Sequence, residues 1–148
     1  MYNLLVILFA VLDCKVWDIK QLVLWADRII VRSAHPKAWL INISTSGSLE
    51  ESLAVIRNAM KEFGVLLPDN VGDLMAGLIL LRFDNREIPA EAVRHHLFDI
   101  IDSYGMSYID VEATEELDLN NEVYSEIRKI AEQAMAHLKS EQLVDCAL

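Results

Sequence analysis

Residues 48–64 read SLEESLAVIRNAMKEFG, and this stretch decides the fold class. Ser48 followed three residues later by Glu51 is a capping-box pattern, in which each side chain binds a backbone N–H group of the other residue. Gly64 suits the left-handed conformation that ends many helices. The apolar side chains between them recur every three or four residues, the period of an amphipathic helix, at Leu49, Leu53, Ile56, Met60 and Phe63.

Helical signals of the same kind occur on both sides of this stretch. Capping residues, proline near the first turn and glycine after the last turn mark most segment ends. Short strands are the alternative over residues 39–43 and 78–83, because Trp and Ile also favour strands. With no strand–helix alternation and no repeat, the sequence predicts an all-α fold, a single compact domain over 1–148 with six or seven short helices. Besides 48–64, the predicted helices cover residues 18–32, 36–44, 69–83, 89–104 and 119–142. In the last of these, the helical period predicts an inward face made of Val123, Ile127, Ile130, Ala134 and Leu138.

The first twelve residues are apolar except for Asn3. The run is shorter than the roughly 20 residues that a transmembrane helix needs. No basic residue precedes it as in a signal peptide, and Asp13 directly before Cys14 does not fit a lipoprotein signal. We therefore expect a buried first element of a cytoplasmic protein, in which Cys14 and Cys146 are reduced.

Composition narrows the class of protein further. Hydrophobic residues make up 53% of the 148 residues, which is too high for a disordered chain. Thirteen basic and 23 acidic residues give a net charge of −10, which argues against general nucleic-acid binding. The acidic residues are concentrated: no Lys or Arg lies between Arg94 and Arg128, and nine carboxylates do.

The densest acidic segment, residues 110–118, is open to three interpretations. It is a solvated surface that aids solubility, a docking face that steers a basic partner, or a site for a divalent cation. The last disagrees with the EF-hand pattern, because Glu115 stands at the sixth position, which requires Gly. The predicted partner-binding residues are Asp110, Glu112, Glu115, Glu116 and Asp118.

Candidate catalytic groups are few. His95, Asp99 and Asp102 follow one face of a predicted helix, a trio that can bind a metal or tune a general base. The more common outcome is an exposed pair with a small effect on the histidine. His96 points about 100° away from His95, so the two cannot share a metal ion. We expect no catalytic residue, no metal site and no cofactor.

The sequence contains no P-loop, nucleophile elbow, HExxH or GxGxxG motif. The N–H groups after Ser48 are those of a helix start, and capping by Ser48 itself is their expected use. Trp17, Trp25 and Trp39 lie in apolar periodic stretches. They are core residues or, together with Tyr2, the lining of an apolar groove between helices.

The first part of the chain also resembles a known class of proteins. Leu24-Trp25-Ala26-Asp27 on a capped helix is followed by Pro36 and by Trp39-Leu40-Ile41-Asn42-Ile43-Ser44. Over residues 4–63 this order is similar to small all-helical bacterial proteins of unknown function, some of them like the immunity proteins of polymorphic toxin systems. The resemblance implies a cytoplasmic protein that acts by binding, and it assigns no functional residue.

These observations favour a non-enzymatic protein–protein interaction module that uses an acidic face to bind a basic protein, with an immunity-type inhibitor as one version. The alternative is a small enzyme or ligand-binding domain with a pocket between helices, where His95, Asp99 and Asp102 would act. A third hypothesis is a structural subunit of a homo-oligomer with the apolar N-terminus as its interface. Neither a membrane nor a nucleic acid is an expected partner.

Overall fold

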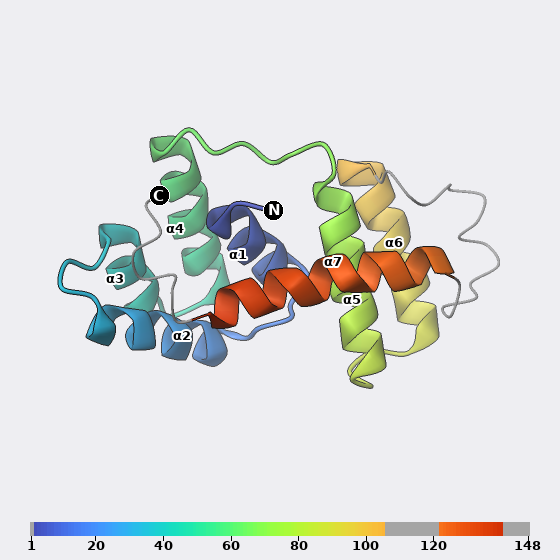
Figure 1. Ribbon diagram of the computed structural model, residues 1–148, viewed down its shortest axis with the longest axis horizontal. Helices are drawn as coiled ribbons and strands as arrows, with labels where there is room; N and C mark the ends of the chain where they lie inside the picture. The colour runs from blue at the N-terminus through green and yellow to red at the C-terminus, as the bar shows by residue number, and fades with distance from the viewer. Residues whose placement is uncertain (1, 106–121, 141–148) are drawn as a thin grey trace. The chain divides into compact units, whose positions relative to one another are not determined.

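The computed structural model describes residues 2–105 and 122–140 (Figure 1). Over these residues the chain forms seven α-helices and no strand, which confirms the all-α prediction. Contacts divide the chain into two compact units. Unit 1 comprises Met1–Leu66 and Ala136–Leu148, and unit 2 comprises Leu67–Met135. The single domain over residues 1–148 stays a prediction, because two compact units can belong to one domain.

Unit 1 contains four helices and the end of a fifth. They are α1 (Leu4–Asp13), α2 (Ile19–Arg32), α3 (Ala38–Ser44), α4 (Leu49–Glu62) and the C-terminal end of α7 (Glu122–Lys139). Helix α2 packs against α3, and α4 packs against both α1 and α3. Every residue from Leu4 to Leu12 is buried, as expected for an apolar first element.

No helix in the described ranges has both the length and the apolar character that crossing a membrane requires.

The helix starts in unit 1 follow local sequence. The Asp18 carboxylate accepts a hydrogen bond from the Gln21 N–H at 2.8 Å, and the Gln21 side chain accepts one from the Asp18 N–H at 2.9 Å. The second predicted capping box is only half formed. Ser48 Oγ accepts from the Glu51 N–H, but the Glu51 carboxylate accepts from Gly47 N–H at 2.8 Å. The carboxylate therefore ties down the loop before the helix instead of the cap residue.

The end of α4 also follows the prediction in part. Gly64 has a φ of 66°, and the next N–H, that of Val65, bonds the Met60 carbonyl at 2.8 Å. Phe63, the last member of the apolar series, is 38% exposed. It lies beyond the final helical residue, so its side chain no longer follows the buried face.

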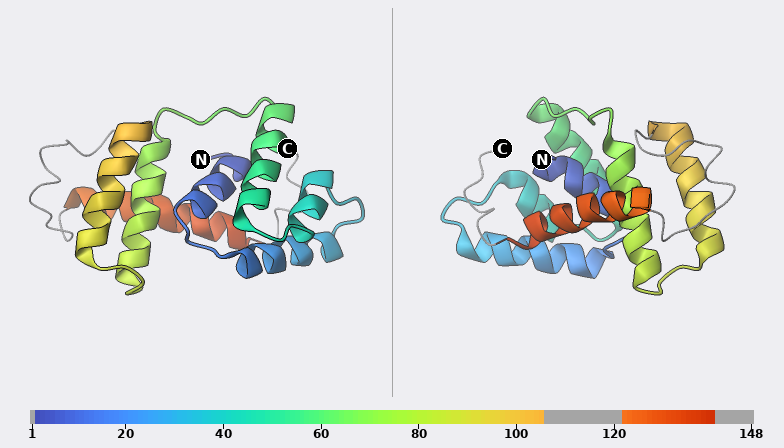
Figure 2. Two further views of the ribbon diagram at one scale, coloured as in Figure 1. Left: turned by 180° about the vertical axis from the view of Figure 1, so that it is seen from behind. Right: turned by 45° about the vertical axis from the view of Figure 1, so that its right-hand side comes forward.

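Unit 2 is built from α5 (Val71–Asp84), α6 (Ala90–Tyr104) and most of α7. Helices α5 and α6 run antiparallel and side by side, and α7 crosses them (Figure 2). All ten residues 71–80 of α5 are buried. The strand alternatives were wrong: residues 78–83 belong to α5, and residues 39–43 to α3. A helix that is apolar on every side shows no amphipathic period, which is why a short apolar run resembles a buried strand.

Gly77 explains how α5 and α7 pack. A Cβ atom at this position would lie 2.4 Å from the Ile127 carbonyl oxygen and 2.8 Å from the Ala131 Cβ. A glycine costs a helix about 1 kcal/mol relative to alanine, and here it permits two helix backbones to approach closely.

The buried face of α7 agrees with the predicted one in part. Ile127, Ala134 and Leu138 are buried as expected, whereas Val123 is 37% exposed and Ile130 is half-buried. Tyr124 and Ala131 are buried as well. Ala131 lies at the close approach to Gly77, where a larger side chain would not fit.

Candidate functional site

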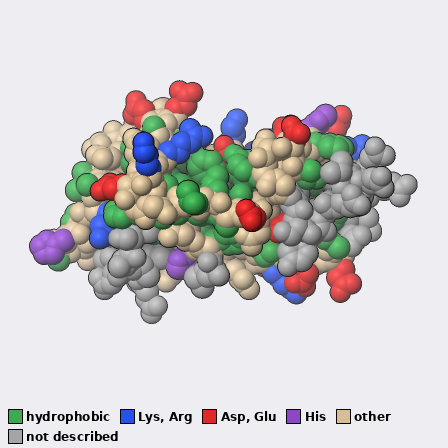
Figure 3. All heavy atoms as spheres, turned by 90° about the horizontal axis from the view of Figure 1, so that it is seen from above, with side chains coloured by type: hydrophobic (Ala, Val, Ile, Leu, Met, Phe, Trp, Pro, Cys, Tyr) green, Lys and Arg blue, Asp and Glu red, His purple; other side chains and the backbone are tan. Residues whose placement is uncertain are grey.

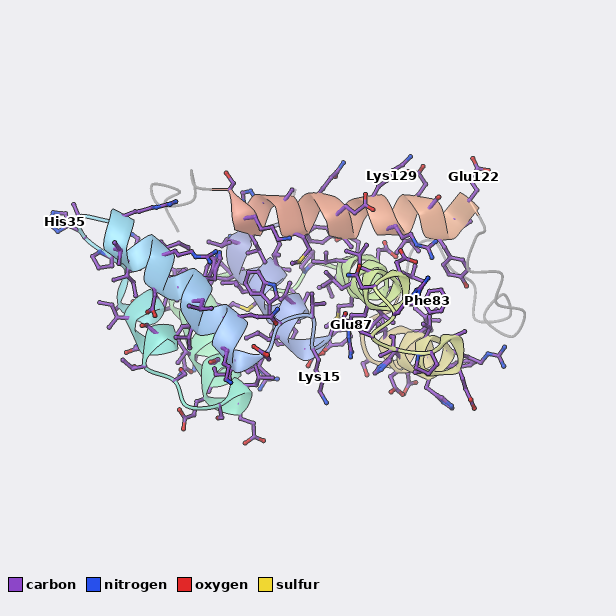
Figure 4. The ribbon with its side chains drawn as sticks, turned by 90° about the horizontal axis from the view of Figure 1, so that it is seen from below. Lys15, His35, Phe83, Glu87, Glu122 and Lys129 are labelled. Atoms are coloured by element: carbon purple, nitrogen blue, oxygen red, sulfur yellow. The ribbon has the colours of Figure 1, made fainter. Side chains whose placement is uncertain are left out.

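The predicted partner-binding residues, Asp110, Glu112, Glu115, Glu116 and Asp118, lie outside the described residues. The helices on either side of this segment carry the rest of the acidic region. Asp99 and Asp102 on α6 are exposed, and so are Glu122 and Glu126 on α7. Figure 4 shows Glu122 projecting from α7, away from α5 and α6. Two helices of unit 2 thus present carboxylates to solvent.

The two units differ sharply in charge. Unit 1 contains eight basic and eight acidic residues, and unit 2 contains five basic and fifteen acidic residues. The whole net charge of −10 therefore belongs to unit 2, and unit 1 is neutral. A charge confined to one compact unit produces a stronger local field than the same charge spread over the whole chain.

Cations of unit 2 form ion pairs within that unit. The Arg128 guanidinium binds the Asp84 carboxylate through two bonds, with Nε–Oδ2 at 2.8 Å and Nη2–Oδ1 at 3.0 Å. Lys129 pairs with Glu126 at 3.1 Å, and Arg82 with Glu87 at 3.9 Å. Since fifteen acidic residues face five basic ones, unit 2 keeps a large excess of negative charge even where its cations are paired.

The alternative site residues do not gather into a site. His95, Asp99 and Asp102 are all exposed on α6. Across the described ranges, no three His, Cys, Asp or Glu side chains come close enough to hold a metal ion. An exposed trio along one helix lacks the enclosing walls that a catalytic base requires.

Ser48 and the two cysteines were the other residues considered from the sequence. Ser48 caps its own helix, as expected. Cys14 is buried, and Cys146 lies outside the described residues. Neither observation points to chemistry at these positions.

A hollow of about 450 Å³ lies in unit 1 between α2 and the C-terminal end of α7. The tryptophan groove predicted from the sequence is correct for Trp17, which lines this hollow. Trp39 is buried instead, with 6% of its surface exposed, and Tyr2 does not line the hollow. Its walls are formed by Trp17, Gln21, Leu24, Trp25, Arg28, Ile29, Arg32, Leu138, Lys139 and Ser140.

One hydrogen bond holds the two walls of this hollow together. The indole Nε1 of Trp25 donates to the Leu138 carbonyl at 2.8 Å, across 113 residues of sequence. That carbonyl is among the last four of α7, which have no partner within their own helix. The Trp17 ring lies 6.1 Å from the Trp25 ring, tilted by 47°. This pairing could not be predicted from the sequence, because capping of a helix end by a distant indole has no local pattern.

No protein family, curated protein or solved structure matches the chain. The resemblance to immunity proteins therefore stays a prediction.

Proposed function

We propose that this chain is a non-enzymatic, cytoplasmic protein–protein interaction module whose acidic unit 2 binds a basic protein. The observation that supports it is the segregation of charge, because the entire net charge of −10 belongs to one of two compact units. A uniformly acidic surface would serve solubility equally well. A neutral unit beside a strongly acidic one is the pattern expected where the charge steers a partner.

The proposed binding residues belong to α6, to α7 and to the sequence segment that connects these helices. They include exposed Asp99 and Asp102 on α6 and exposed Glu122 on α7. The apolar side chains of Phe98 and Val123, each 37% exposed, lie next to these carboxylates in sequence. Partly exposed apolar groups among charges are typical of interfaces, where apolar contacts contribute affinity and charges raise the rate of association. The proposed core of the surface is Asp110, Glu112, Glu115, Glu116 and Asp118.

An immunity-type inhibitor from a bacterium is the specific version of this proposal. Such a protein acts by covering a toxin, and it needs a complementary surface without chemistry of its own. An acidic unit suits a toxin with a basic active face, and electrostatic steering would give the rapid association that inhibition requires.

Two matched variants test the proposal. Asp99→Lys with Asp102→Lys alters unit 2, and Asp13→Lys with Glu62→Lys makes the same change of four charge units in unit 1. All four side chains are exposed, and the control pair lies at helix C-terminal ends, where a cation is tolerated. The wild type and both variants serve as bait in the native cell lysate, at low salt and at about 0.5 M salt, where surface charges are screened.

We expect one basic protein to be captured by the wild type and by the unit 1 control. It should be released by salt and weakened at least about tenfold by the unit 2 variant, since rim charges govern association. Reversal of Glu115, Glu116 and Asp118 to Lys should weaken it further and flatten the salt dependence. Equal capture by both matched variants, or no basic partner at low salt, would reject the acidic unit as a docking surface.

A further inference from the structure

The hollow in unit 1 has the composition of a recognition groove. Its apolar lining includes Trp17, Leu24 and Trp25, and Leu24 is 55% exposed. Trp25 is 8% exposed and its N–H bonds Leu138, so this side chain forms the floor of the groove, and Trp17 and Leu24 supply more of its accessible apolar surface. Exposed apolar side chains are not confined to this groove, since the face seen in Figure 3 also has apolar side chains among charged ones. An apolar lining of this kind excludes water and gains affinity from bulky apolar side chains.

Among the described residues, the charged side chains that line this groove are cationic. Arg28, Arg32 and Lys139 contribute positive charge, and no described Asp or Glu is among the lining residues. All three are exposed. This is notable in a chain with 23 acidic and only 13 basic residues. Charge complementarity therefore favours an occupant that combines carboxylates with apolar groups.

The groove runs along a helix. From Gln21 to Arg32, α2 advances about 16 Å, which equals three turns of a helix laid beside it. The lining positions on α2 recur at intervals of three and four residues, so one face of the helix forms the wall. Helix-in-groove recognition uses apolar anchors spaced in the same way on the partner. A single-stranded nucleic acid is less suitable, because unit 1 is neutral overall and offers no extended basic track.

We infer that this groove binds an acidic amphipathic helix of a partner protein. Apolar side chains of that helix contact Trp17, Leu24 and Trp25, and its carboxylates pair with Arg28 and Lys139. The groove is a different site from the acidic surface of unit 2. It is proposed to bind an acidic partner, whereas the acidic surface is proposed to bind a basic one. The inference goes beyond the proposed function, and its test uses different residues.

Peptide display on the full-length chain tests this inference. A library of random 16-residue peptides is selected on the wild type, and the affinity of the selected peptide is then measured by tryptophan fluorescence. Arg28→Glu with Lys139→Glu alters the groove. Lys20→Glu with Lys37→Glu is the matched control, because both lysines are exposed in unit 1 and neither lines the groove.

We expect selected peptides with Asp or Glu and bulky apolar residues three or four positions apart. The groove variant should weaken them at least about tenfold, and the control should change affinity less than about twofold. Trp17→Phe should reduce the fluorescence change on binding. Reversal of Asp99 and Asp102 to Lys should leave peptide affinity unchanged, which separates this site from the acidic surface.

Several outcomes would overturn the inference. No enrichment, or peptides rich in Lys and Arg, would show that the groove does not select acidic helices. Tighter binding of a labelled oligothymidine than of the selected peptide would assign the groove to nucleic acid. Self-association of the wild type that the groove variant abolishes would assign it to a second copy. A tenfold gain in peptide affinity on reversing Glu141 and Asp145 to Lys would assign it to the chain's own C-terminal segment.

Discussion

Unit 1 and unit 2 each bury one helix almost completely, but with different side chains. The buried residues of helix α1, from Leu4 to Leu12, are large apart from Ala10. Helix α5 includes Ala76 and Gly77, and the second of these lets α7 approach to backbone contact. Apolar content decides that a helix is buried, whereas side-chain size decides how closely its neighbour packs.

The surfaces of the two units differ as much as their cores. Unit 1 balances its charges and gathers cations around tryptophans in a groove, and unit 2 carries all the excess negative charge. We propose that these two surfaces bind partners of opposite charge.

The largest effect is expected at Gly77. Replacement by alanine drives a methyl group against the Ile127 carbonyl, which is backbone and cannot rotate away. Gly77→Ala should lower the free energy of unfolding by about 2–3 kcal/mol, as over-packed cores do. Urea unfolding followed by circular dichroism measures it. Gly47→Ala is the control in unit 1, because its added Cβ meets only a flexible Glu51 oxygen at 3.7 Å. An equal loss in both variants would show that close packing does not distinguish unit 2.

An intermediate effect is expected from two buried tryptophans of unit 1. Trp25 is 8% exposed and donates a hydrogen bond, whereas Trp39 is 6% exposed and its Nε1 has no partner among the described residues. Trp25→Phe loses a bond and leaves the Leu138 carbonyl unsatisfied. Trp39→Phe removes only a donor that is already unpaired. The free energy of unfolding should fall by about 1 kcal/mol more for Trp25→Phe.

Urea unfolding of the two tryptophan variants measures this difference in the free energy of unfolding. Both substitutions remove a similar volume from a buried position, so the difference isolates the hydrogen bond to the end of α7. If Trp39→Phe is the more destabilising variant, that bond does not hold the walls of the groove together.

The smallest effect concerns one phenol in unit 2. Burial raises the pKa of Tyr124 above its ordinary value of 10.0, since desolvation disfavours the phenolate. The unfolded chain then releases this proton at lower pH than the folded chain. The contribution to stability is present below pH 10 and is lost as pH rises above it. Between about pH 8 and pH 11, the free energy of unfolding should fall less in Tyr124→Phe than in the wild type. Parallel pH profiles for the two proteins would contradict the burial of this phenol.

Local features of the fold were predictable because their partners are neighbours in sequence. Asp18 and Gln21 are three residues apart, and the capping box predicted from them forms. Gly64 ends α4 for a reason that needs no tertiary contact, namely its freedom to adopt a positive φ. The competition between Gly47 and Ser48 for the Glu51 carboxylate was not predictable, because both N–H groups lie within its reach.

The two candidate sites also differ in whether the sequence alone reveals them. The acidic region is a property of composition, so the sequence located it without knowledge of the fold. The groove required a structure, since only tertiary packing places Trp25 beside Leu138 and brings Arg28 and Lys139 to one hollow. The sequence pattern did not distinguish Trp17 from Trp39 as groove-lining residues. Packing buries Trp39, whereas Trp17 lines the groove.

The sequence alone determined that this protein is all-helical, where most of its helices begin and end, and where its negative charge lies. These properties depend on the identity and spacing of residues within a few turns of chain. Tertiary structure decided which further side chains of α7 are buried, the close approach at Gly77 and the groove lined by two tryptophans. Each of these depends on which side chains from distant segments fill the same volume, and a periodic pattern does not encode that choice.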